Sequence, residues 1–263
     1  MVKDEADVIE GAIRHMSDEG VAGIIVADNG STDGTRELLE KLDLPCELLL
    51  VDDPEIAYYQ SRKMTRLAEQ AAERGAEWII PFDADELWTA SDRLGVFLDQ
   101  QPADVHVVRA ALTHHFCTAV DCDDPDPFRA MEWRQARPAD LPKVAFRYCP
   151  GVVIQPGNHA VMIGSHWQPG GQTGLAIRHF PYRSESQFIS KARNGAAAYA
   201  ETVLPEGIGA HWRQYGLILE RQGEEGLREV FRQHFYYLAP VESGMIRDPA
   251  PYLRWQALKG GTP

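Results

Sequence analysis

Three acidic residues, Asp83, Asp85 and Glu86, follow directly after a mostly apolar run at 78–82. Such a run predicts a buried strand, and ligands of open α/β sheets bind beyond the carboxyl ends of the strands. Carboxylates that converge there suit a hard divalent cation that is shared with the phosphates of a substrate. The alternative is a polar turn or a helix cap, because Asp is common in both.

A second polar segment, 28–35, reads Asp-Asn-Gly-Ser-Thr-Asp-Gly-Thr and follows a short β-rich run at 23–27. It combines Asn-Gly and Asp-Gly turn signals with a Ser/Thr/Asp cap for the helix that begins near its end. The order of elements here is strand, polar turn and helix.

Helical and strand periodicities alternate through the first 112 residues. They predict helices at 4–17, 35–42, 57–74 and 92–100, and strands at 23–27, 47–51, 78–82 and 104–112. Alternation of this kind predicts a mainly parallel central sheet with helices on both faces. Right-handed crossovers place the strand ends on one edge, so we expect Asp28 to meet Asp83 and Asp85 there.

The second half of the chain is less regular. It predicts strands at 143–147, 152–154 and 174–179, a helix at 184–201, and two helical stretches within 211–237 that are broken near Gly223. Ser184 opens the helix at 184–201 with a capping pattern, because Gln187 follows at the third position. We find neither an internal repeat nor a linker, so the sequence predicts one domain, 1–263, with a helical C-terminal portion.

Composition limits the kinds of partner. The chain has 263 residues, of which 44% are hydrophobic and 25% charged, as in ordinary globular proteins, and no apolar run approaches the length of a membrane span. A formal net charge of -13 would repel a phosphate backbone, so we do not expect nucleic acid as a partner. An anionic substrate would then need a metal ion.

The cysteines and the first residues bear on the compartment. Cys46, Cys117, Cys122 and Cys149 lack the paired C-x-x-C spacing of a zinc or redox site, which favours buried or incidental thiols. Met1 leads straight into Val-Lys-Asp-Glu, with neither a charged leader nor an apolar signal region. We therefore expect a cytoplasmic protein.

Three stretches together resemble the family 2 glycosyltransferases with the GT-A fold, in particular the branch with a shortened C-terminal half. They are Val-Lys-Asp-Glu-Ala at 2–6, Ala-Asp-Asn-Gly-Ser-Thr-Asp-Gly-Thr at 27–35, and Phe-Asp-Ala-Asp-Glu at 82–86, which looks like the Asp-x-Asp motif of that family. Their order makes the match more specific than any single motif. The resemblance implies a nucleotide-diphospho-sugar transferase fold with a Rossmann-like sheet, in which 1–101 bind the nucleotide sugar and 102–263 the acceptor.

The resemblance also implies roles in binding the donor. It places Glu5 and Asp28 at the base and ribose, Asp83 at the ribose or the metal, and Asp85 as the ligand of Mn²⁺ or Mg²⁺. Arg62 stands where the family often has a basic group near the nucleotide. A divalent ion that bridges the diphosphate oxygens would neutralise the leaving group as a Lewis acid. The alternatives are a turn residue for Asp28 and a solvated helix face for Arg62.

Histidines are the next candidate ligands. Related enzymes often place a His or Asp well after the Asp-x-Asp motif as a further metal ligand, and His179 stands at such a position. The alternative is a packed or surface histidine. Weaker candidates are His114, His115, His166 and His211.

The catalytic base departs from the family pattern. Inverting members often use a Glu-Asp pair far downstream, and no such dipeptide follows Glu86. His159 follows a predicted strand, and the ordinary pKa of histidine suits a general base near neutral pH. Asp124, Asp140 and Glu185 remain open alternatives.

Glu86 and Trp88 are candidates for the acceptor side, because an aromatic ring offers an apolar face on which a sugar can stack. The alternative for Trp88 is a structural anchor for the loop that follows.

The sequence thus predicts a metal-dependent, inverting glycosyltransferase that moves a sugar from a UDP-, GDP- or dTDP-sugar to an acceptor hydroxyl. Inversion comes from the resemblance alone. A non-catalytic scaffold that binds nucleotide sugars is the main alternative, and the missing Glu-Asp pair favours it. A nucleotidyltransferase is disfavoured because 2–11 lack a Gly-rich, basic phosphate loop.

Overall fold

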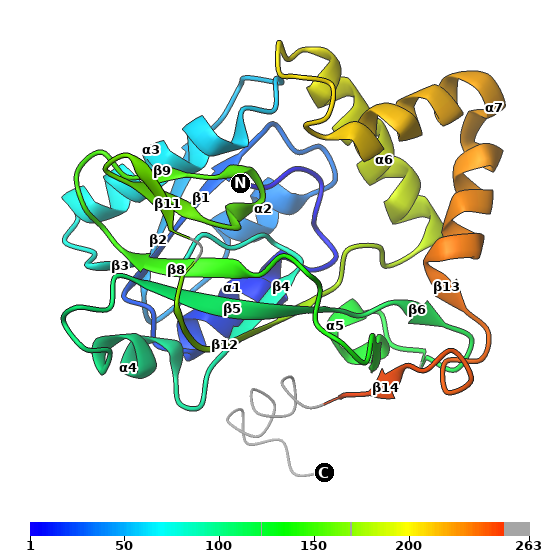
Figure 1. Cartoon of the computed structure of the whole chain (residues 1–263). Helices are drawn as coiled ribbons and strands as arrows, with labels where there is room; N and C mark the ends of the chain where they lie inside the picture. The colour runs from blue at the N-terminus through cyan, green and yellow to red at the C-terminus, as the bar shows by residue number, and fades with distance from the viewer. Residues whose placement is uncertain (122, 169, 250–263) are drawn as a thin grey trace.

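The computed structural model describes residues 1–121, 123–168 and 170–249, in which helices and strands are mixed (Figure 1). The helices are α1 (Ile9–Asp18), α2 (Thr35–Glu40), α3 (Gln60–Glu73), α4 (Leu94–Asp99), α5 (Pro127–Ala130), α6 (Glu185–Ala200) and α7 (Ala210–His234), with a 3-10 turn η1 (Pro156–Asn158). The mixed α/β class that the sequence predicts is confirmed.

A five-stranded sheet crosses the middle of the molecule (Figure 1). Its order is β3 (Trp78–Ile79), β8 (Lys143–Arg147), β5 (Val107–His114), β12 (Gln172–His179) and β4 (Glu86–Thr89). Only β5 and β12 pair in parallel, and the other neighbours are antiparallel. The sheet is therefore mixed rather than mainly parallel.

The strands β1 (Gly23–Asp28) and β2 (Glu47–Asp52) form a separate parallel pair. The prediction of one mainly parallel central sheet that joins them to the strand at 78–82 is wrong in this structure. Strand pairing ends at Ile79, where β3 joins β8, and Pro81 has no backbone N–H to donate to a ladder. Ile80 to Phe82 run on without a strand partner.

Short strands tie the second half of the chain together. β9 (Val153–Ile154), β10 (Val161–Ile163) and β11 (His166–Gln168) form an antiparallel sheet. β6 (Cys117–Thr118) pairs with β13 (Tyr236–Tyr237), and β7 (Trp133–Arg134) with β14 (Ile246–Arg247). The last two pairs fasten the segment after α7 to the middle of the chain.

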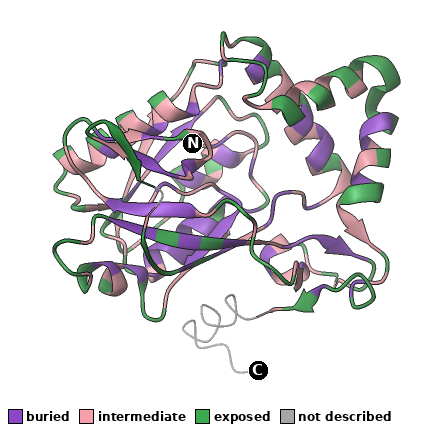
Figure 2. Cartoon of the chain, viewed as in Figure 1, coloured by how far each residue is buried: buried purple, intermediate pink, exposed green. Residues whose placement is uncertain are grey.

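The core lies between the sheets and α1, and buried residues are concentrated on β4 and β8 and alternate with exposed ones along β5 (Figure 2). Ile9, Ile13 and Met16 recur at helical spacing on one face of α1, and each is at most 1% exposed. They pack in one cluster with Trp88 of β4, which is fully buried. The apolar stripe read from the sequence is therefore the face that holds α1 against the sheet.

The helices α6 and α7 pack against each other beside the sheet (Figure 1). The predicted cap is confirmed, because Ser184 Oγ accepts the backbone N–H of Gln187 at 3.1 Å. The predicted break in the last helix is also confirmed. Gly223 interrupts α7 with φ 67° and ψ -163°, a conformation that a residue with a Cβ rarely adopts.

Two further expectations concern the membrane and the thiols. Within the ranges that the structure describes, no helix has both the length and the apolar character needed to cross a bilayer. Cys46, Cys117 and Cys149 are free, and Cys117 is buried, while Cys122 lies outside the described residues.

Candidate functional site

The polar loop after β1 positions the first residues of the chain. Thr35 Oγ1 accepts the N–H of Glu5, and Asp33 Oδ2 accepts that of Ala6, both at 2.9 Å. The turn and cap residues at 28–35 therefore satisfy backbone donors of the adjacent segment. This contact turns the side chain of Glu5 toward the end of the central sheet, where it pairs with Arg183 and Lys191.

Asp85 is the best-connected acid of the site. It is 4% exposed, and its Oδ2 lies 2.5 Å from Lys191 Nζ, 3.5 Å from His179 Nε2 and 3.8 Å from Arg183 Nη1. Burial alone would raise the pKa of this carboxyl, but the cation of Lys191 above all holds it well below its usual range. Asp85 is therefore an ionised carboxylate at neutral pH.

Asp83 and Glu86 share a single lysine. Lys143 of β8 is 4% exposed, and its Nζ lies 2.5 Å from Asp83 Oδ2 and also contacts the carboxylate of Glu86. Glu86 Oε2 accepts the indole N–H of Trp88 at 3.0 Å. Burial lowers the pKa of Lys143, but the two carboxylates outweigh it and raise that pKa. The group holds three charges inside the sheet.

His114 and His179 end two adjacent parallel strands, and their Nδ1 atoms lie 2.9 Å apart. One ring must donate and the other accept. Burial first, and then the neighbouring His179, lower the pKa of His114 to about 4, so this ring is neutral. When its Nδ1–H donates to Nδ1 of His179, the Nε2–H of His179 faces the carboxylate of Asp85, which can accept it.

These groups open into a cavity of about 530 Å³. Asp83, Asp85 and His179 line its sheet side, and Lys63 and Lys191 also face it. A volume of this size is typical of sites for small molecules and cofactors. The cavity therefore joins carboxylates, an imidazole and two ammonium groups.

Aromatic side chains line the same cavity from the helical side. They are Tyr58, Tyr199 of α6, and His211 and Trp212 of α7. The rings of Tyr58 and Tyr199 are 5.1 Å apart, in a tilted arrangement. Such faces can stack on a base or a sugar ring, next to the charged groups on the sheet side.

The predicted nucleotide contacts Asp28 and Arg62 do not line this cavity. Asp28 Oδ1 accepts the N–H of Ser31 at 3.1 Å and its hydroxyl at 2.6 Å, which is the turn role. The side chain of Arg62 is 64% exposed and pairs with Glu55. The next residue on α3, Lys63, lines the cavity instead of Arg62.

His159 does not line the cavity either. Its Nδ1 lies 2.9 Å from the carbonyl oxygen of Pro142, and the ring packs against Gly157. The alternatives Asp124 and Glu185 pair with Arg129 and with Arg232 and Arg228, and Asp140 is exposed on a loop. None of these four residues is therefore placed to act as the catalytic base at this cavity.

The weaker histidine candidates separate in the structure. His115 is buried and stacks on Phe180 at 4.5 Å, and His166 is exposed on β11. His211 lines the cavity and keeps an exposed part, and its partial burial lowers the pKa of its ring.

The acceptor candidates Glu86 and Trp88 are both 0% exposed. Each is engaged within the core, Glu86 by Lys143 and Trp88 by the cluster against α1. Neither side chain reaches the cavity surface, so the expectation that they contact an acceptor is corrected. Trp88 has the structural role that was its alternative.

A divalent cation fits the donor set in part. Asp85 Oδ2 and His179 Nε2 are 3.5 Å apart, close enough for both to bind one ion with bonds near 2.1 Å. Across the described part of the chain, no group of three or more His, Cys, Asp or Glu side chains is arranged to hold a metal. A metal here would need oxygens from a substrate, and Lys191 would have to release Asp85.

Sequence reasoning missed the basic half of the site, which consists of Lys63, Lys143, Arg183 and Lys191. Lys143 could have been found, because it belongs to an otherwise mostly apolar β-run that predicts burial. A buried lysine nearly always has an acidic partner. Lys191 lies on an ordinary helix face, where its sequence resembles a solvated position.

No protein-family model matches the chain, and no curated protein sequence matches it significantly. What the chain does must therefore be argued from the cavity and its charges.

Proposed function

We propose that the chain is a glycosyltransferase of the GT-A type that takes a nucleoside-diphosphate sugar as donor. One observation carries this proposal: Asp83, Asp85, Lys63 and Lys191 line one cavity together with the aromatic wall. Lys63 Nζ also lies 2.6 Å from Asp53 Oδ2, which it would share with a phosphate. The carboxylates suit a divalent ion, the ammonium groups suit phosphate oxygens, and the rings suit a base or sugar. A nucleotide sugar bound with a divalent ion requires all three.

The order of elements supports the fold type. Helix α1, β1, α2, β2, α3 and β3 alternate in sequence, and the acidic residues follow β3. The cavity is lined both by the segment before residue 101 and by α6 and α7. This supports the division into a half that binds the nucleotide sugar and a half that binds the acceptor.

Asp85 and His179 would hold Mn²⁺ or Mg²⁺, with the diphosphate supplying further oxygens. The ion would neutralise the charge that develops on the leaving diphosphate. Lys191 is 2.5 Å from Asp85 and is placed to move to a phosphate oxygen when the ion binds. In this proposal Glu5 orients Lys191 and Arg183, rather than touching the base.

We assign the proton acceptor to His211 in place of His159. His211 lines the cavity next to Trp212, and its lowered pKa keeps it neutral and able to take a proton from an acceptor hydroxyl. A His211→Asn variant is expected to lose at least about tenfold in kcat while its donor affinity stays the same. A His159→Asn variant is the matched control, and its kcat should stay within a few-fold of the wild type.

The direct experiment measures thermal stabilisation and donor hydrolysis with UDP-, GDP- and dTDP-sugars, with MnCl₂ or with EDTA. A donor that binds only the folded chain raises its melting temperature. We expect one donor class to stabilise the protein in the presence of Mn²⁺, and Asp85→Asn to abolish that stabilisation. The control is Asp52→Asn, since this side chain is 84% exposed at the end of β2.

Two results would count against the proposal. If Asp85→Asn bound every donor as well as the wild type does, the acidic pair would have no part in donor binding. If donors bound in the presence of metal but no hydrolysis or transfer followed with any acceptor tested, the non-catalytic scaffold would be the better account.

A further inference from the structure

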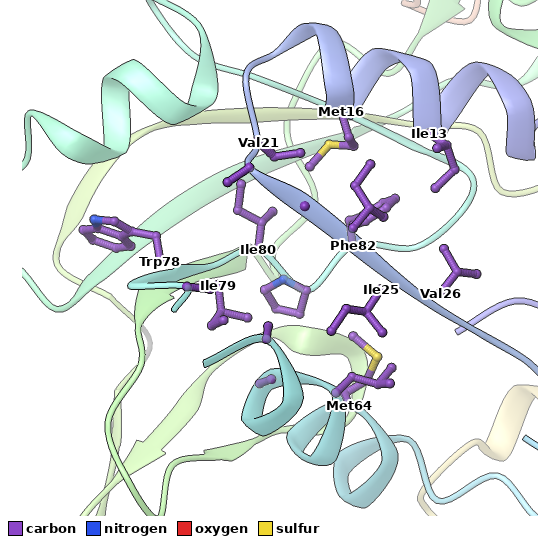
Figure 3. Close-up of a pocket in the computed structure, with 18 of the residues that line it drawn as sticks. Ile13, Met16, Val21, Ile25, Val26, Met64, Trp78, Ile79, Ile80 and Phe82 are labelled. Carbon is purple, nitrogen blue, oxygen red and sulfur yellow. The ribbon is translucent and has the colours of Figure 1, made fainter. Parts of the chain in front are cut away.

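A second cavity, of about 380 Å³, lies between β1 and the segment 78–82, and it shares Met1, Val2 and Ala84 with the lining of the candidate site. Helix α1 covers it on one side with Ile13 and Met16, and α3 on the other with Met64 (Figure 3). A single water needs only about 10–15 Å³, so this void is large for a protein interior. Most of the side chains that line it are apolar, and backbone groups supply much of the polar part of its lining.

One wall of the cavity is an unpaired strand edge. β1 pairs with β2 alone, which leaves its other edge facing the void. At the end of that edge, Ala27 accepts the N–H of Val2, and Asn29 donates its N–H to the Val2 carbonyl, both at 2.9 Å. Because backbone groups alternate along a strand, the N–H and C=O of Ile25 point into the void as well.

The opposite wall is a second unpaired edge. Trp78 and Ile79 pair with β8 on one side only, and the edge of 78–82 across from β8 faces the void. The two edges run in the same direction with the cavity between them (Figure 3). A strand in this space would join the β1–β2 pair to the five-stranded sheet.

Val2 already occupies the end of such a strand, because it bridges Asp28 in the parallel sense. Continuing that register places Met1 opposite Ala27, and leaves Gly23 to Val26 for four more residues. The amino group of Met1 is buried beside Met64, whose Sδ lies 4.0 Å away, and burial lowers its pKa. A neutral amide N–H would suit this place better than an ammonium group.

We propose that the cavity is the seat of an extended apolar segment of four residues, joined to the amino group of Met1 and paired in parallel with β1. Both faces of this strand would be buried, under α1 and over α3, which calls for a continuous Val/Ile-type run rather than an alternating one. The inference rests on the cavity and the two open edges, and it is independent of the proposed function.

The test compares two N-terminal extensions of the full chain. One adds four β-branched apolar residues before Met1. The other has the same length, with proline at the residue that directly precedes Met1 and at the residue two positions earlier. In the register of Val2, these two residues would donate their N–H groups to the carbonyls of Ile25 and Gly23, and proline has none to donate.

The expected result is a melting temperature several degrees higher for the apolar extension than for the proline extension or the chain without one. Hydrogen exchange at the amides of Ile25 and Ala27 should slow at least about tenfold. The amides of Ile24 and Val26, which face β2, should change less and serve as internal controls.

The chain without an extension gives an independent check. Its Ile25 amide should exchange faster than those of Ile24 and Val26, and protection equal to theirs would overturn the proposal. It would also be overturned if both extensions gave the same melting temperature and exchange. Protection of Ile25 by a free apolar tetrapeptide, or only in a dimer seen by sedimentation velocity, would show a separate partner or a second copy in place of a joined strand.

Discussion

The Oδ2 atom of Asp85 lies 2.5 Å from Nζ of Lys191, although 106 residues separate the two in the chain. The lysine therefore occupies the face of the carboxylate that a divalent ion would use. In the proposed function a metal and Lys191 would compete for Asp85, and the released ammonium group would lie next to the phosphates that the metal brings.

Replacing Lys191 with Met should remove this competition, so that a metal ion can bind Asp85 more easily. Without metal, Asp85 would lose its nearest cation, and we expect the free energy of unfolding to fall by about 3 kcal/mol or less, since Arg183 and His179 remain nearby. With Mn²⁺ the variant should regain stability, and its Mn²⁺ affinity should exceed that of the wild type. Urea unfolding with MnCl₂ and with EDTA measures both effects.

Arg193→Met is the control for this experiment. Arg193 lies on the same helix, but its side chain is 51% exposed and pairs with Glu224, so its loss should cost under about 1 kcal/mol with or without metal. Equal Mn²⁺ stabilisation of the wild type and the Lys191→Met variant would show that the lysine does not compete with a metal.

Local patterns in the sequence were enough to predict six of the helices that the structure describes, although α1 begins at Ile9 and not at residue 4, and the short α5 was not predicted. The apolar spacing of α1, the cap at Ser184 and the break at Gly223 depend on residues within a few positions of each other. The strand at 143–147 is confirmed with the same limits, because a β-branched and aromatic run is also a local signal.

The pairing of distant segments could not be read in this way. The strand at 78–82 was predicted to lie in one parallel sheet with β1, yet β3 pairs with β8, more than sixty residues later. Likewise Asp85 and Glu86 are consecutive acids, but one faces the cavity and the other the core, where it meets Lys143. Glu86 is the structural acid because folding brings Lys143 to it, and the sequence around Glu86 does not show this contact.

Stability should fall as the pH drops below the ordinary pKa of histidine. Burial lowers the pKa of His15 and of His115 from 6.5 to about 4. Between these values the unfolded chain binds protons that the folded chain does not, so stability is present above pH 6.5 and is lost toward pH 4. Each histidine should contribute about 1.4 kcal/mol per pH unit within this window.

His15→Gln isolates one of these contributions. Glutamine can still donate a hydrogen bond to the Trp88 carbonyl, which His15 Nε2 meets at 2.6 Å, but it cannot take up a proton. The free energy of unfolding, measured in urea from pH 4.5 to 7.5, should therefore depend less steeply on pH in the variant. The difference in slope should correspond to about one proton fewer taken up on unfolding. A slope identical to that of the wild type would show that His15 does not titrate as its burial implies.

The buried pair of Lys143 and Glu86 allows a double-mutant cycle. Lys143→Met should lower the free energy of unfolding by about 3–5 kcal/mol at pH 7, because it leaves Glu86 and Asp83 without their shared cation. Adding Glu86→Gln should recover part of this loss, since the fully buried carboxylate that Lys143 had neutralised is then removed as well. Burial raises the pKa of Glu86, so the loss in Lys143→Met should also shrink near pH 5. Additive effects of the two substitutions would contradict the observed contact.

The aromatic wall depends on Gly195, which lines the cavity on α6. A Cβ at this position would lie 2.5 Å from Cε3 of Trp212, too close for the indole to keep its place. Gly195→Ala should therefore displace Trp212, cost about 1–3 kcal/mol of stability and shift the tryptophan emission. If the wall stacks on the nucleotide sugar, donor affinity should fall as well, while Mn²⁺ binding at Asp85 stays unchanged.

Gly207→Ala is the matched control for that substitution, because a Cβ there meets nothing within 4 Å. It should leave stability within about 0.5 kcal/mol and donor affinity unchanged. If Gly195→Ala shifted the emission of Trp212 but left donor affinity at the wild-type value, the aromatic wall would not contact the donor. The acceptor would then be the remaining candidate for this side of the cavity, and a Trp212→Ala variant measured at saturating donor would test it through KM for the acceptor.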